Sequence, residues 1–177
     1  NRASEMELAS KMAFEDEYPS GRSTRIVLVP VGTKGIENYQ KTVEHPVPLD
    51  RIEPFISETQ FTYLSSTLEA PEACIWGAAP GPRNRKNYRR IQEMDIALFY
   101  QDGRYISSHY VVKKLASNYG LAKELWGLDN EGQTWDLIYV LGKGRPEDIA
   151  IGDVAKIAGE GPRTAVRGLW VLDRAAS

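Results

Sequence analysis

Two strand-like segments joined by an Asp-Gly pair restrict the fold of this chain more than any other feature. Residues 96–100 and 105–112 are rich in β-branched and aromatic side chains, and Asp102 and Gly103 lie between them. A tight turn between strands requires positive φ, which glycine adopts without a steric penalty. The sequence therefore predicts a β-hairpin, and we expect the stretch 74–141 that contains it to organise the domain.

Short helices and further strands are expected on both sides of the hairpin. Helical patterns occur at residues 4–18, 88–92, 118–126 and 146–158, and strand patterns at 24–31, 60–66, 134–141 and 164–172. Residues 36–43 fit a short helix or an irregular segment, and Pro46, Pro48 and Pro54 predict an extended connector. Because strands and helices do not alternate regularly, the pattern favours an α+β fold with a barrel-like mixed sheet flanked by short helices.

Chain length and composition indicate one ordinary globular domain. The chain has 177 residues, of which 42% are hydrophobic and 26% charged. We expect residues 1–58 to be an accessory helix, strand and connector, and residues 59–177 to form the functional domain. No apolar run approaches the roughly 20 residues of a membrane-spanning helix, so no membrane partner is expected. Cys74 is the single cysteine, which excludes an internal disulfide and favours the cytoplasm.

Residues able to bind a metal or to act as nucleophiles are scarce. The chain has two histidines and one cysteine, and they form no cluster at ligand spacing. Residues 142–145, Gly-Lys-Gly-Arg, lack the full glycine-rich pattern of a phosphate loop. We therefore expect no catalytic residue, no metal and no cofactor in this chain.

A dense basic run is the clearest binding feature. The net charge of the chain is −2, so nucleic-acid binding requires a local basic patch. Residues 83–90 supply such a patch, interleaved with asparagine and tyrosine, and no acidic residue lies between Glu72 and Glu93. We predict that its cations contact the DNA backbone: Arg83, Arg85, Lys86, Arg89 and Arg90.

The four tryptophans divide into two groups by position. Trp76 and Trp126 each precede a glycine at the end of an element, where a ring can form the wall of a pocket. Trp135 and Trp170 occur within strand patterns and are expected in the core. Trp76 and Trp126 are therefore the candidate pocket residues.

Several short motifs together resemble the EVE/YTH/ASCH group of the PUA-like superfamily. They are Ile75-Trp76-Gly77, residues 95–100, Leu125-Trp126-Gly127 and residues 134–139. The resemblance covers roughly residues 61–141 and is greatest to the domains at the N-terminus of modification-dependent restriction endonucleases, HNH-fused or McrB-type. It implies a PUA-like curved mixed sheet flanked by short helices, with residues 59–177 as the EVE/PUA-like domain.

The resemblance also implies a function. It implies a DNA-binding specificity module that flips a modified base into an aromatic pocket, with 5-methylcytosine or 5-hydroxymethylcytosine favoured over N6-methyladenine. The implied partners are double-stranded DNA carrying that base and a nuclease or AAA+ motor on the same or another chain. The positions that match the pocket are Trp76, Trp126, Ser65, Ser66, Tyr100 and Leu128, with Ser65 and Ser66 at the end of a strand.

Two alternative functions remain open on the sequence. Some ASCH-type relatives resemble small amidohydrolases that act on modified nucleosides, and Lys113, Lys114 and Glu124 are the residues that such a site would use. The second alternative is an RNA-binding domain of the YTH kind that recognises N6-methyladenine.

Overall fold

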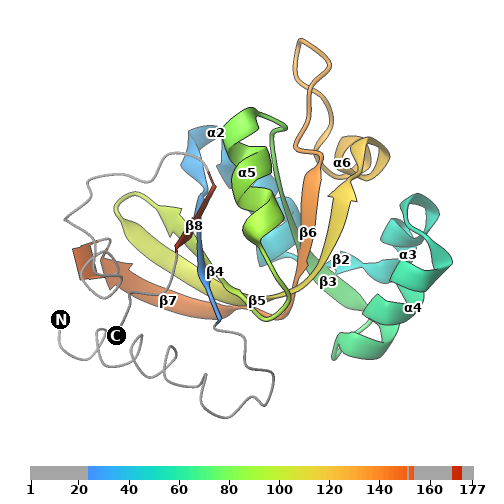
Figure 1. Cartoon of the computed structure of the whole chain (residues 1–177), viewed down its shortest axis with the longest axis horizontal. Helices are drawn as coiled ribbons and strands as arrows, with labels where there is room; N and C mark the ends of the chain where they lie inside the picture. The colour runs from blue at the N-terminus through green and yellow to red at the C-terminus, as the bar shows by residue number, and fades with distance from the viewer. Residues whose placement is uncertain (1–23, 151, 154–168, 173–177) are drawn as a thin grey trace.

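A mixed eight-stranded sheet forms the framework of the described protein (Figure 1). The computed structural model describes residues 24–150, 152–153 and 169–172. The strand order is β2-β3-β6-β5-β4-β1-β8, and β7 pairs with β5 outside this path. The strands are β1 (Ile26–Pro30), β2 (Val47–Pro48), β3 (Glu72–Ala78), β4 (Ile96–Gln101), β5 (Arg104–Ser117), β6 (Leu137–Leu141), β7 (Arg145–Ala150) and β8 (Trp170–Leu172). The α+β fold class is confirmed, and the sheet does not close into a barrel.

The predicted hairpin is present and its second strand connects the two halves of the sheet. Asp102 and Gly103 form the turn between β4 and β5 with φ of 49° and 83°. The first half of β5 pairs with β4 and β7, and its second half pairs with β6. Register shifts occur in the second half, where Ala116 has φ of 59°. Such bulges bend a strand, so β5 carries the sheet from one half to the other.

Short helices cover this sheet. They are α2 (Gly32–Tyr39), α3 (Leu49–Ile52), α4 (Glu58–Thr67), α5 (Pro82–Arg90) and α6 (Tyr119–Trp126), with a π-helical turn η2 (Gln40–Glu44) after α2 and a 3₁₀ turn η3 (Glu53–Phe55) after α3. The helix expected at 118–126 is confirmed as α6. It begins after Asn118, whose side chain accepts a hydrogen bond from Leu121 N and caps the helix. In the described part of the chain, no helix is long and apolar enough to cross a membrane.

The strand predicted at residues 60–66 is wrong, because this segment lies in α4. Ser57 and Gln60 form a capping box, in which each side chain bonds the backbone N–H of the other residue. Phe61, Leu64 and Leu68 then recur at helical spacing and pack into the same apolar cluster. The capping box and this apolar face outweigh the local strand-like alternation.

Replacing Ser57 by alanine should lower the free energy of unfolding by about 1 kcal/mol, because an N-terminal donor of α4 loses its acceptor. Urea denaturation measures the change. Ser65→Ala is the matched control, since Ser65 is an exposed serine of the same helix, and its effect should stay within about 0.5 kcal/mol. Equal effects of the two substitutions would show that the capping box contributes nothing.

Two other predicted segments also differ. The proline-rich connector at 46–54 is wrong, because β2 pairs with β3 and α3 buries Leu49 and Ile52. The helix predicted at 146–158 is wrong over residues 146–150, which form β7 and pair with β5, burying Ile149. The rest of that segment beyond Asp153 lies outside the described residues, as does the helix predicted at 4–18. Of the strand predicted at 164–172, β8 (Trp170–Leu172) is described.

The described part of segment 1–58 contributes the interior strand β1 and the edge strand β2. β1 lies between β4, to which it is parallel, and β8, to which it is antiparallel. Val27 and Val29 of this strand are buried in the largest apolar cluster. Residues 24–58 thus belong to the same sheet as the described strands that follow them in the chain.

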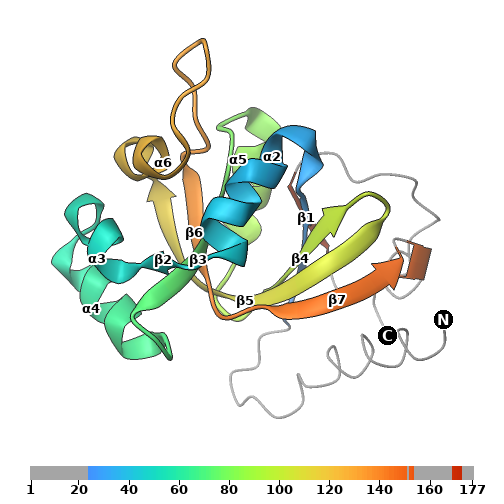
Figure 2. The same ribbon diagram turned by 180° about the vertical axis from the view of Figure 1, so that it is seen from behind.

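The main core lies inside the curled sheet, between its two halves. Its largest cluster joins Val29 of β1, Phe99 of β4 and Trp76 of β3. Tyr88 of α5 and Tyr39 of α2 pack against the same cluster. Figure 1 shows α5 nearest the viewer between β4 and β6, and Figure 2, from behind, shows α2 in the corresponding place. The two helices therefore cover the core from opposite sides.

Candidate nucleic-acid interface

A cavity of about 380 Å³ opens where β1, β3, α2 and α5 meet. Three strands separate β1 from β3 in the sheet order, yet the ends of both line this cavity. The sheet must therefore curl around it. The lining residues are Val29, Pro30, Val31, Gly32, Thr33, Lys34, Gly35, Trp76, Gly77, Ala78, Ala79, Asn84, Trp135, Tyr139 and Leu169.

Two tryptophans form the aromatic wall of the cavity. Trp76 is 3% exposed, and its ring centroid lies 5.3 Å from that of Phe99. Trp135 is half-buried just before β6, with its ring centroid 5.2 Å from that of Trp76. A Cβ atom on Gly35 of α2 would lie 3.4 Å from Trp135 Cη2 and 3.6 Å from Trp76 Cη2. A Cβ atom there would make ordinary van der Waals contact with both rings, so α2 packs directly beside them at this position.

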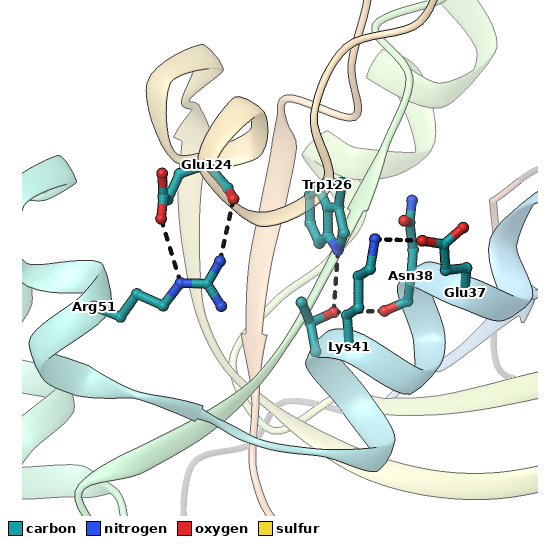
Figure 3. A network of polar contacts seen from close by, with 7 residues as sticks. Glu37, Asn38, Lys41, Arg51, Glu124 and Trp126 are labelled. Atoms are coloured by element: carbon teal, nitrogen blue, oxygen red, sulfur yellow. Dashed lines mark hydrogen bonds and ion pairs between the residues drawn. The ribbon is translucent and has the colours of Figure 1, made fainter.

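Trp126 lies against these two rings but does not line the cavity. Its ring centroid is 6.4 Å from that of Trp76 and 6.0 Å from that of Trp135. Its Nε1 donates to Thr42 Oγ1 at 3.2 Å (Figure 3). Thr42 Oγ1 in turn donates to the Ile75 carbonyl at 2.6 Å. A Cβ atom on Gly77 would overlap the Trp135 carbonyl oxygen and lie 2.8 Å from Trp126 Cζ3. Trp126 therefore supports the wall from outside the cavity.

The other four predicted pocket residues lie elsewhere on the molecule. Ser65 and Ser66 are exposed on α4, not at the end of a strand. Tyr100 of β4 packs against Tyr105 at 5.6 Å between ring centroids. Leu128 is 40% exposed in the segment between α6 and β6, which projects from the molecule in Figure 1. None of the four lines the cavity, and their part in base binding stays a prediction.

Residue types alone did not reveal two parts of the cavity. Trp135 was expected in the core, but it precedes β6 and lines the cavity. Residues 32–35, which the sequence patterns assigned to no element, form the first turn of α2, which carries no side-chain cap. The available signal was a pair of glycines, Gly32 and Gly35, directly after a buried strand.

The basic run forms the helix α5, which begins at the cavity. Pro82 occupies its first turn, a position that favours proline. Asn84 and Tyr88 lie on its inward face, where Asn84 lines the cavity and the Tyr88 hydroxyl donates to the Ile138 carbonyl at 2.6 Å. Burial raises the pKa of Tyr88, so the hydroxyl stays a neutral donor. The Lys114 ammonium donates to the carbonyl of Arg89 at 3.3 Å at the other end of the helix.

The predicted phosphate-binding cations point away from this packed face. Arg83, Arg85, Lys86 and Arg89 are exposed, and Arg90 is half-buried. Arg85 Nε donates to the Pro80 carbonyl, which holds its side chain near the start of the helix. No carboxylate among the described residues forms an ion pair with Arg85, Lys86 or Arg89. Their charges are therefore open to an external anion, and they lie on the same helix whose inward face lines the cavity.

Residues that an amidohydrolase site would need are engaged elsewhere. Lys113 Nζ lies 3.4 Å from Glu93 Oε1, and Glu124 accepts from Arg51 Nε at 3.4 Å (Figure 3). With Lys114 committed to the end of α5, none of the three proposed catalytic residues lines the cavity. Within the described residues, no group of three histidine, cysteine or acidic side chains could hold a metal ion.

Comparison with known proteins gives a structural relationship. No family model and no curated protein matches this chain. Among solved structures, it matches the N-terminal domain of Thermococcus gammatolerans McrB bound to m5C DNA, with a TM-score of 0.62. The match covers 85% of this chain and 91% of that one, at 12% sequence identity. The two chains share a fold. This shared fold is consistent with the PUA-like curved mixed sheet that the resemblance implies.

Proposed function

We propose that this chain is a non-catalytic DNA-binding domain that receives a modified base, extruded from the duplex, in the cavity between α2 and α5. The observation that supports this most is the position of α5, whose exposed cations start beside a cavity with an aromatic wall. Phosphate contacts supply affinity without sequence information, and a stacked base supplies recognition. The matching McrB domain, which is bound to m5C DNA in its own structure, favours DNA over RNA.

The proposed base is a modified cytosine, stacked on Trp76 and Trp135. Flipping a base costs a few kcal/mol of stacking energy, which aromatic faces partly restore. A buried methyl group adds about 0.8 kcal/mol of apolar burial. The proposed domain belongs with the EVE-like modules and directs a restriction nuclease or AAA+ motor on the same or another chain.

The test is equilibrium binding to duplexes that differ at one base: cytosine, 5-methylcytosine, 5-hydroxymethylcytosine, adenine and N6-methyladenine. We expect the tightest binding to a cytosine modified at position 5, by about fourfold over cytosine, because 0.8 kcal/mol corresponds to that ratio. Equal affinities for all five duplexes would contradict the proposal. Hydrolysis of a free modified nucleoside would instead support the amidohydrolase alternative.

A further inference from the structure

Asn84 is the polar side chain of α5 that lines the cavity. Its Nδ2 donates to the Ala79 carbonyl at 2.9 Å. Because a carbonyl oxygen can only accept, this contact fixes which end of the carboxamide carries the hydrogens. Oδ1 has no hydrogen-bond partner among the described residues. The cavity therefore contains an acceptor that is oriented and unoccupied by protein.

Tyr139, another residue of the cavity lining, carries a second polar group without a partner. Its side chain is fully buried and lines the cavity, and its hydroxyl has no hydrogen-bond partner among the described residues. A buried hydroxyl without a partner destabilises a folded protein, so its retention points to a ligand that satisfies it. Burial raises the pKa of Tyr139, and the neutral hydroxyl can both donate and accept.

We propose, on the basis of the function proposed above, that the cavity selects bases that carry an exocyclic amino group. Asn84 Oδ1 accepts from the amino group, and the Tyr139 hydroxyl bonds the adjacent polar atom of the ring edge. 5-Methylcytosine has an amino group at C4, whereas thymine has the same methyl group at C5 and an O4 acceptor at that place. Thymine would set O4 against Asn84 Oδ1, two acceptors with no hydrogen between them. The selection therefore depends on hydrogen bonding, since the two bases have nearly the same shape.

A duplex with a central 5-methylcytosine·guanine pair and a duplex with a thymine·guanine mismatch distinguish selection by hydrogen bonding from selection by base shape. The mismatched base flips more easily, so without polar selection the thymine duplex would bind at least as tightly. We expect the protein to bind the 5-methylcytosine duplex about tenfold more tightly, measured by fluorescence anisotropy. Equal affinity for the two duplexes, together with a retained preference for 5-methylcytosine over cytosine, overturns this inference and leaves the proposed function standing.

Asn84→Ala should reduce the ratio between the two duplexes to about threefold or less, because the acceptor is removed. Asn87→Ala is the matched control on the same helix. The Asn87 side chain bonds the Arg83 carbonyl and Val171 N and does not line the cavity, so the ratio should be retained. An unchanged ratio in the Asn84→Ala protein, with both variants folded, overturns the role of Asn84.

Tyr139→Phe gives an independent readout. Binding to the 5-methylcytosine duplex should weaken about three- to tenfold, while the thermal midpoint stays equal to or above that of the parent, because the unpaired buried hydroxyl is removed. A lower midpoint with unchanged binding would make the hydroxyl a structural group and overturn its role. If the parent binds cytosine and 5-methylcytosine duplexes alike, the proposed function fails, and this inference fails with it.

Discussion

Replacing Trp135 by alanine is expected to weaken binding to a duplex that contains 5-methylcytosine by about five- to 150-fold. The indole lines the cavity beside Trp76, and one stacked base contributes about 1–3 kcal/mol. Trp135 is half-buried, so the variant should keep enough stability to be measured in its folded state. Fluorescence anisotropy with the modified and unmodified duplexes measures the decrease in affinity, which should fall mainly on the modified one.

Two other tryptophan substitutions locate the wall of the pocket. Trp126→Ala is expected to weaken binding indirectly, because the Trp126 ring packs against Trp76 and Trp135 and supports them. The same substitution should also lower the free energy of unfolding. Trp76 is 3% exposed, so Trp76→Ala should cost about 3–5 kcal/mol of folding free energy, and Trp76→Phe is the better binding variant. Tyr110→Ala is the control, because Tyr110 is an exposed aromatic residue outside the cavity. Parent-like binding by a folded Trp135→Ala protein would place the base elsewhere.

Removal of two cations from α5 is expected to change the salt dependence of binding. In an Arg85→Ala/Arg89→Ala protein, the slope of log K against log salt should fall by about 0.9 for each phosphate that the protein no longer neutralises. Both side chains are exposed on the outward face of the helix, so the fold should be unaffected. Since phosphates carry no sequence information, affinity for modified and unmodified duplexes should decrease by similar factors.

The matched control removes two cations from another surface, in an Arg51→Ala/Lys123→Ala protein. Both are exposed residues of α3 and α6, outside the helix that borders the cavity. Binding to each duplex is measured between about 50 and 200 mM salt, a range over which phosphate binding produces a large change in affinity. An unaltered slope for the α5 variant would mean that the basic helix face does not contact DNA. A decrease confined to the modified duplex would mean that these arginines contact the base.

The features that the sequence by itself determined are those with local causes. Asp102 and Gly103 specify the β4–β5 turn through the φ angles of two adjacent residues. Asn118 specifies the start of α6 through a hydrogen bond to a residue three positions later. The basic run likewise gathers its cations in one place because they all lie within residues 83–90 of the chain. In each case the interacting groups are close in sequence, so the pattern of residue types is sufficient.

Tertiary structure alone decided the features that depend on distant partners. Residues 145–150 form a strand because β5 offers an edge with which they pair. The cavity combines Gly35 of α2, Asn84 of α5, Trp135 before β6 and Trp76 of β3. The curl of the sheet, which depends on bulges in β5 and on the strand order, brings these elements together. No local pattern encodes such a meeting, because it results from packing between segments that are far apart in the chain.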